Sequence, residues 1–226
     1  MALLSNLFFP RTCPQCGLGV GKKTARGRLC ESCLRRLPRT EQAVLKQNET
    51  ELTLADKRLE RAAAFLFYEK DHPIQRVVHQ MKYADMPEIG YQLGRQAALE
   101  WQDTEFFADL DVIVPMPLHP RRLRERGYNQ SEYIARGISE VTGVPVDTSH
   151  VLRSRNTPKQ ALQDGEDRRQ NVADAFAVVR PEQLYRKRIL VVDDLITTGE
   201  TMKACLKAMR VIRGARISVF ALCKAR

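Results

Sequence analysis

The sequence predicts an α/β protein in which a parallel sheet is flanked by helices, with a small cysteine-rich module at the N-terminus. Three observations support this prediction. Runs of apolar β-formers alternate with helical patterns from residue 62 onward. One such run, residues 189–192, ends in two adjacent carboxylates and is followed by a short polar loop and a helical pattern. Two Cys-x-x-Cys pairs precede all of these elements.

Length and composition fit a globular protein with a real core. The 226 residues have room for one ordinary domain and a small appendage, and 43% of them are hydrophobic. No apolar run approaches the roughly 18 residues of a membrane span, so we expect no membrane insertion. The first ten residues lack a basic segment and a small-residue cleavage site, so we expect no signal peptide and a cytoplasmic protein. A net charge of +10 favours anionic partners, although a solvated basic surface gives the same charge.

Four of the six cysteines form the pairs Cys13/Cys16 and Cys30/Cys33. Four thiolates from two tight turns suit the tetrahedral site of structural zinc, and a cytoplasmic setting disfavours disulfides. A thioredoxin-like redox pair is the alternative. We predict a zinc-binding module over residues 1–40, which either staples a small segment or offers a docking surface to nucleic acid or protein. The remaining Cys205 and Cys223 lie in apolar patterns and are predicted core residues.

A polar connector over residues 41–61 is predicted to join this module to the main domain, residues 62–226. The domain should begin with a strand at 62–68 and two amphipathic helices that end near Lys82 and Trp101. At the end of the first helix, Lys82 either directs a cation at a pyrophosphate or lies exposed.

A strand at 112–118 should run into a turn stiffened by Pro115 and Pro117. The basic run at 121–126 follows directly. An arginine cluster at a strand end can neutralise a pyrophosphate, and a solvated helix face is the alternative. Asn129 is predicted to cap the next helix. Residues 153–172 are polar, cationic and poorly periodic, which is typical of a lid or binding loop or of a surface insertion.

The pair Asp193-Asp194 is the most informative feature of the chain. Two adjacent carboxylates fit the carboxyl end of a parallel strand, where open α/β sheets bind ligands. The following Thr-Thr-Gly-Glu-Thr offers three hydroxyls at a helix N-terminus, which favours an anion. Thr198 is a predicted cap of that helix, and Gly214 a predicted end. A ribose phosphate would satisfy both the loop and the carboxylates; an ordinary strand–turn–helix is the alternative.

Four apolar residues, Asp-Asp, two apolar residues and Thr-Thr-Gly-x-Thr resemble the signature of type I phosphoribosyltransferases, which bind 5-phosphoribosyl-1-pyrophosphate (PRPP). With the cysteine pairs, Val-Pro-Met-Pro-Leu-His-Pro at 114–120 and Arg-Gly-Tyr-Asn-Gln at 126–130, the chain resembles the ComF/GntX family over essentially its whole length. The resemblance implies a type I phosphoribosyltransferase-like parallel sheet, an N-terminal zinc module, and a link to natural competence and use of external DNA.

The same resemblance assigns site residues. The PRPP loop would comprise Asp193, Asp194, Thr197, Thr198, Gly199, Glu200 and Thr201. Pyrophosphate would meet the turn of Met116, Pro117, Leu118 and His119, the arginines Arg121 and Arg122, and a closing loop with Arg155, Lys159 and Gln160. Zinc would be structural, and Mg²⁺ would arrive with PRPP.

Two classes of function follow from these assignments. The first is transfer of a phosphoribosyl group to a nitrogen nucleophile, for which the sequence shows neither an acceptor pocket nor a general base. The second is a non-catalytic competence factor that binds single-stranded DNA or docks a competence or recombination protein.

Overall fold

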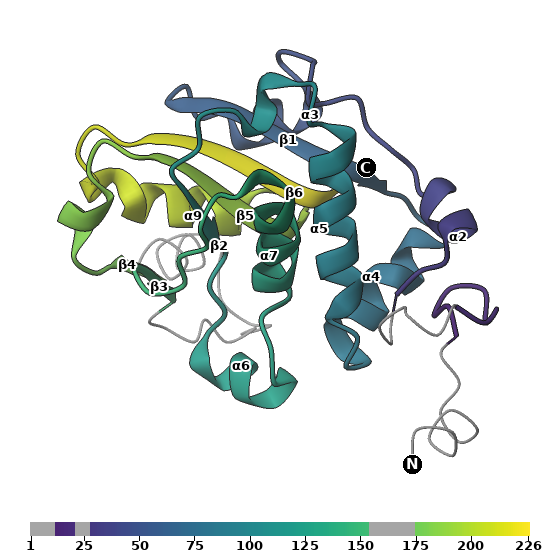
Figure 1. Ribbon diagram of the computed structural model, residues 1–226. Helices are drawn as coiled ribbons and strands as arrows, with labels where there is room; N and C mark the ends of the chain where they lie inside the picture. Colours follow the sequence, from purple (N-terminus) through teal and green to yellow (C-terminus); the bar gives the residue numbers. More distant parts are fainter. Residues whose placement is uncertain (1–11, 21–27, 154–174) are drawn as a thin grey trace, which may run out of the picture.

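The structure is a computed structural model that describes residues 12–20, 28–153 and 175–226 (Figure 1). Its centre is a four-stranded sheet in the order β1-β6-β5-β2. All three strand pairings are parallel, as the sequence predicts. The strands are β1 (Leu59–Tyr68), β6 (Arg216–Ala225), β5 (Arg188–Ile196) and β2 (Val112–Pro115).

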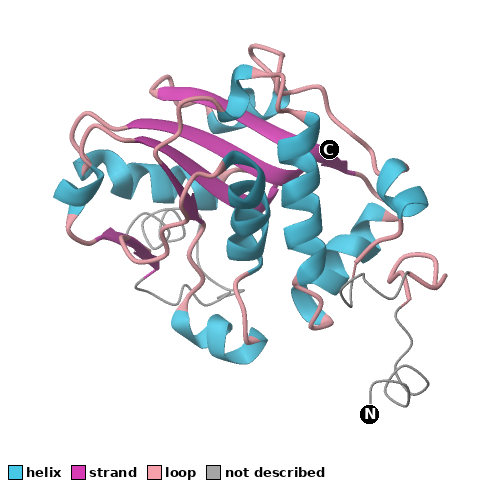
Figure 2. Cartoon of the chain, viewed as in Figure 1, coloured by secondary structure: helices cyan, strands magenta, loops and turns pink. Residues whose placement is uncertain are grey.

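Helices cover both faces of this sheet (Figure 2). One face packs against α4 (Ile74–Tyr83), α5 (Glu88–Glu100) and α7 (Gln130–Thr142). The other packs against α9 (Glu200–Ala208) and α3 (Glu49–Leu54). Successive side chains of a strand point to opposite faces, so Leu190 and Val192 join the first layer while Ile189 and Val191 join the second.

Two glycines let α5 and α7 cross at close range. A Cβ on Gly94 would overlap the backbone of Ile134, and a Cβ on Gly137 would overlap the carbonyl group of Tyr91. Because these obstacles are backbone atoms, they cannot move aside as a side chain can. The crossing fixes the position of the α7 N-terminus, which lies beside the acidic pair.

The described part of the cysteine module packs on α4 and α5. Cys30 caps its helix α2 (Glu31–Arg35), and Cys13, Leu29 and Leu37 are buried in the core of the first helical layer. The backbone of Leu29 exchanges two hydrogen bonds with the Gln92 side chain, at 2.7 and 2.9 Å. The amide of Gln80 donates to the Pro14 carbonyl at 2.9 Å. The module therefore shares a core with the first helical layer.

The remaining elements are short. Helix α6 (Pro120–Arg126) follows β2, and β3 (Val151–Arg153) pairs antiparallel with β4 (Phe176–Val178). The 3-10 helices are η1 (Glu105–Phe107), η2 (Pro181–Leu184) and η3 (Met209–Val211). Within the three described ranges, no helix has the length and apolar character needed to cross a membrane.

Most predicted elements are confirmed, with shifted ends. The first strand begins at Leu59 rather than at residue 62, and the strand at 112 ends at Pro115. Asn129 caps α7, because its side chain accepts a hydrogen bond from the Ser131 N–H. The prediction that Thr198 caps α9 is wrong: Gly199, at a φ of 78°, precedes the helix, and no side chain caps it. Both Cys205 and Cys223 are fully buried.

Candidate functional site

Two carboxylates lie side by side, buried, near the carboxyl end of the central strand β5. Asp193 is 9% exposed and Asp194 is 5% exposed. One Asp193 oxygen, Oδ1, accepts hydrogen bonds from the Ser131 hydroxyl at 3.2 Å and from the Asp194 N–H at 2.8 Å. Ser131 stands at the start of α7, so that helix reaches the acidic pair directly.

A lysine from the first helical layer neutralises the second carboxylate. The Nζ of Lys82, at the C-terminal end of α4, lies 3.0 Å from Asp194 Oδ1. Lys82 is therefore not the exposed helix end that was one interpretation of the sequence. Its charge is paired within the protein rather than directed at a ligand alone. The other oxygen, Asp194 Oδ2, is buried and has no hydrogen-bond partner in the part of the chain that the structure describes. A buried acceptor without a partner costs free energy, so binding of a hydrogen-bond donor or a cation at this oxygen would be favourable.

The environment also makes the first carboxylate easier to protonate than a free aspartate. Burial, followed by the adjacent charge of Asp194, raises the pKa of Asp193 to about 7. Lys82, Ser131 and the Asp194 N–H oppose this shift. A bound cation would add to the opposing effects and favour the ionised pair.

The loop after β5 presents its polar groups to solvent. Thr197, Thr198 and Glu200 are exposed, whereas Gly199 is buried against Thr53 and Leu54 of α3. The Thr201 side chain is half-buried in the first turn of α9. Because no side chain caps α9, its first N–H groups and the threonine hydroxyls can serve an anion.

The proline-containing turn begins beside the acidic pair. The Met116 N–H donates to the Val192 carbonyl at 2.7 Å, so the turn starts next to the residue that precedes Asp193. Met116 is buried, and its carbonyl accepts a hydrogen bond from Asn129. Pro117 and Leu118 are half-buried, and the His119 imidazole caps α6 by accepting from the Arg121 N–H.

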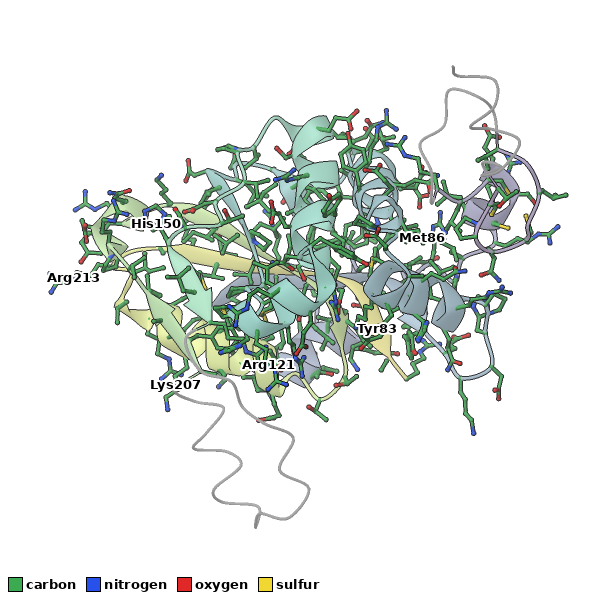
Figure 3. All side chains as sticks on the ribbon, turned by 90° about the horizontal axis from the view of Figure 1, so that it is seen from below. Tyr83, Met86, Arg121, His150, Lys207 and Arg213 are labelled. Carbon is green, nitrogen blue, oxygen red and sulfur yellow. The ribbon has the colours of Figure 1, made fainter. Side chains whose placement is uncertain are left out.

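The two predicted arginines of α6 have different surroundings. Arg121 is exposed and paired with Glu125 at 2.8 Å, the arrangement of a solvated helix face. Arg122 is also exposed, but it lines a cavity of about 580 Å³ between α4 and α6. The other residues that line this cavity are Lys82, Tyr83, Asp85, Glu125, Arg126 and Tyr128. Figure 3 shows this side of the molecule, with Tyr83 of α4 and Arg121 of α6 labelled.

The structure thus brings together the acidic pair, the loop at 197–201, the turn at 116–119 and Arg122. Arg155, Lys159 and Gln160 lie outside the described residues. Sequence reasoning included Arg126 in the basic run but gave no role to Ser131 or to Tyr128, whose hydroxyl donates to the Met81 carbonyl at 2.7 Å. The Arg-Gly-Tyr-Asn-Gln segment at 126–130 contained a signal for Tyr128, because it connects two helices next to the predicted turn, and Ser131 follows it directly.

The four cysteines of the N-terminal module also converge. The sulfur atoms of Cys13, Cys16, Cys30 and Cys33 all lie within 4.8 Å of one another. Burial alone would raise the pKa of the Cys13 thiol, but N–H groups of Cys30, Cys16 and Gln15 lower it to about 7. Burial and the neighbouring sulfur atoms raise the pKa of Cys33. Four thiolates this close need a cation, and the arrangement could hold a zinc ion.

Comparisons with known proteins identify relatives of this chain. No protein-family model matches the chain. The DNA utilization protein YhgH of Escherichia coli strain K12 is 29% identical over 215 residues, which cover 94% of this chain and 83% of that protein. The Competence protein F of Haemophilus influenzae is 32% identical over 158 residues, which cover 68% of this chain and 69% of that protein. This chain belongs to the ComF family.

Solved structures similar to this ComF-family chain are phosphoribosyltransferases. Glutamine phosphoribosylpyrophosphate amidotransferase from B. subtilis matches with a TM-score of 0.42 and 20% identity, over 63% of this chain and 30% of that one. A hypoxanthine-guanine phosphoribosyltransferase from Leishmania tarentolae matches with a TM-score of 0.32 and 16% identity, over 60% and 63% of the two chains. Scores this low carry no argument about the site, which stands on its own geometry.

Proposed function

We propose that this ComF-family protein binds a ribose 5-phosphate ligand of the PRPP type, together with Mg²⁺, at the carboxyl end of β5. The observation that carries the proposal is the buried pair Asp193 and Asp194, followed at once by exposed threonines at a helix N-terminus without a side-chain cap. Carboxylates suit sugar hydroxyls and hydrated Mg²⁺, whereas the loop suits a phosphate.

The groups around the pair support a ligand with a second anionic end. Lys82 and Arg122 line the adjacent cavity, and the turn at 116–119 begins beside Asp193. In this proposal the loop at 197–201 holds the 5′-phosphate, the acidic pair holds the ribose, and the turn with Arg122 faces the pyrophosphate. Positioning and charge stabilisation would be the contribution of the protein to any phosphoribosyl transfer.

Calorimetric titration with PRPP and Mg²⁺ tests the proposal. Asp193→Asn and Asp194→Asn should each weaken binding about tenfold or more, because each removes a charge-assisted hydrogen bond. The matched control is Asp103→Asn, which changes an exposed carboxylate outside the site and should leave binding unchanged. Equal binding by the wild type and the Asp193→Asn/Asp194→Asn double variant would exclude this site.

We also propose that Cys13, Cys16, Cys30 and Cys33 hold one structural zinc ion. The convergence of four sulfur atoms, and the difficulty of ionising them without a cation, support this choice. Metal analysis of the purified protein should find about one zinc per chain. A folded protein that contains no metal would contradict the proposal.

A role in the use of DNA is the second candidate, suggested by the names of the relatives from Escherichia coli and Haemophilus influenzae. The net charge of +10 is compatible with nucleic acid. If the protein binds single-stranded DNA through phosphate contacts, affinity should fall steeply as salt is raised. Fluorescence anisotropy with a labelled oligonucleotide measures this slope, and a flat salt dependence would argue against the second candidate.

A further inference from the structure

One charged side chain belongs to two neighbouring features of the site. Lys82 Nζ pairs with Asp194 Oδ1 at 3.0 Å, and Lys82 also lines the cavity between α4 and α6. Its side chain is only 19% exposed, so neighbouring atoms restrict the conformations that it can adopt. The ammonium group therefore lies between a buried carboxylate and an open cavity with arginine in its wall.

The two sides of Lys82 compete for the same charge. While it is paired with Asp194, the attraction of the ammonium group for an anion in the cavity is offset by the carboxylate. Asp194 Oδ2 has no partner among the described residues, so the carboxylate can still accept a hydroxyl or a cation. A ligand that supplies a donor to Asp194 would release Lys82 toward the cavity.

The cavity is suited to an anion once Lys82 is released. Arg122 and Arg126 come from α6, and the Arg126 guanidinium lies 5.2 Å from the centre of the Tyr83 ring. Asp85 and Glu125 also line the cavity and would oppose an anion. Glu125 is already paired with Arg121, so Arg122 and Arg126 face Asp85, and a released Lys82 would add a further positive charge for an anion.

We propose that Lys82 is a specificity-determining residue that couples the acidic pair to this cavity, so that a ligand carrying both hydroxyls and a diphosphate is preferred over diphosphate alone. The proposal rests on the proposed function, because it takes the acidic pair as the ribose site. A free diphosphate must pull Lys82 from Asp194 and leave a buried carboxylate unpaired. A pentose with a diphosphate group replaces the lost partner and avoids this cost.

The proposal predicts that one substitution changes the affinities for PRPP and for inorganic diphosphate in opposite directions. Asp194→Asn should weaken binding of Mg-PRPP but strengthen binding of inorganic diphosphate by about tenfold, because Lys82 gains a free charge. Calorimetry with inorganic diphosphate, without Mg²⁺, measures the second effect. An unchanged or lower diphosphate affinity in Asp194→Asn would overturn the proposal.

A second substitution identifies the source of the gain. In Lys82→Met/Asp194→Asn the tenfold gain should disappear, whereas in Lys207→Met/Asp194→Asn it should persist, because Lys207 lies in the last turn of α9 and is exposed. A gain that survives loss of Lys82 would overturn the proposal. Lys82→Arg keeps the charge and should retain part of the preference for PRPP.

An experiment on the unaltered protein covers the case in which a variant fails to fold. Saturating ribose 5-phosphate should raise the affinity for inorganic diphosphate severalfold, because occupancy of Asp194 releases Lys82. Independent binding of the two probes would overturn the proposal.

Failure of this proposal and failure of the proposed function are distinguishable. If Mg-PRPP does not bind but Asp194→Asn strengthens diphosphate binding, Lys82 acts as described and the PRPP proposal is wrong. If Mg-PRPP binding needs Asp194 but Asp194→Asn leaves the diphosphate affinity unchanged, the PRPP proposal stands and the proposed role of Lys82 is wrong.

Discussion

The cysteine module and the acidic pair are both clusters of like ionisable groups, but they are built in opposite ways. The four sulfur atoms come from a turn at Cys13 and Cys16 and from the start of helix α2, and all lie within 4.8 Å of one another. The two carboxylates are adjacent in the chain and draw their partners Lys82 and Ser131 from distant helices. The first cluster is a closed set that needs a cation from outside. The second already contains a cation, and one of its oxygens has no hydrogen-bond partner among the residues that the structure describes.

The comparison implies that loss of one member should be most damaging in the closed set. Cys30→Ser should release the metal and destabilise the protein by on the order of 5 kcal/mol or more, because metal binding and folding are coupled. Metal content and thermal unfolding measure the two effects. Cys205→Ala is the control, since this cysteine is a core residue and the metal should remain. Retention of metal by Cys30→Ser would contradict the four-sulfur site.

In the acidic pair, the largest expected loss comes from removing the internal cation. Lys82→Met should lower the free energy of unfolding by about 3 kcal/mol at pH 7, because it leaves the buried Asp194 carboxylate unpaired. Adding Asp194→Asn should restore most of the loss. Urea unfolding of the two single variants and the double variant gives the coupling energy. A coupling near zero would show that the ion pair does not contribute to folding.

Protonation of Asp193 gives the pair a pH dependence. Its pKa in the folded protein, about 7, is above the unfolded value, so its contribution to stability is complete below about pH 4 and is lost as pH rises through about 7. In the wild type, the free energy of unfolding should therefore fall by on the order of a few kcal/mol between about pH 4 and 7, and Asp193→Asn should remove most of this fall. Urea unfolding across this range measures the slope. With Asp103→Asn, the control, the slope should match that of the wild type.

The α5–α7 crossing connects the two regions, because α5 holds the cysteine module through Gln92 and α7 holds Asp193 through Ser131. Gly94→Ala should destabilise the protein by about 2 kcal/mol, since the new Cβ overlaps the backbone of Ile134. It should also weaken Mg-PRPP binding by displacing Ser131. Gly19→Ala has open space around its Cβ and should be nearly neutral. Thermal unfolding measures the stability of the two variants, and calorimetry measures their Mg-PRPP binding. Equal stability of Gly94→Ala and Gly19→Ala would contradict the tight crossing.

The smallest effect on stability should come from the exposed face of α6. Arg121→Ala removes an exposed ion pair with Glu125 and should change the free energy of unfolding by less than about 0.5 kcal/mol. Urea unfolding measures this. A larger loss would mean that α6 contributes more to folding than its exposure suggests.

Much of the fold was predictable because its signals are local. The alternation of apolar runs with helical patterns predicted the parallel sheet and its helical layers, and Asn129 was recognisable as a cap. Ends of elements were less predictable, as the start of β1 at Leu59 shows. The cap of α9 was predicted wrongly because Thr198 is a good capping residue, whereas the left-handed backbone of Gly199 directs the chain into the helix without it.

By itself, the sequence determined which chemical groups the protein gathers: four thiols at zinc spacing, an acidic pair at a strand end, and a threonine-rich loop. These are set by spacing along a few residues, which turn and strand geometry converts directly into proximity. Only the tertiary structure decided which partners those groups have. Lys82 reaches Asp194 because α4 packs across the sheet near the end of β5, and Ser131 reaches Asp193 because two glycines let α7 approach α5. Spacing along the chain carries no information about such contacts, since they depend on how whole layers pack.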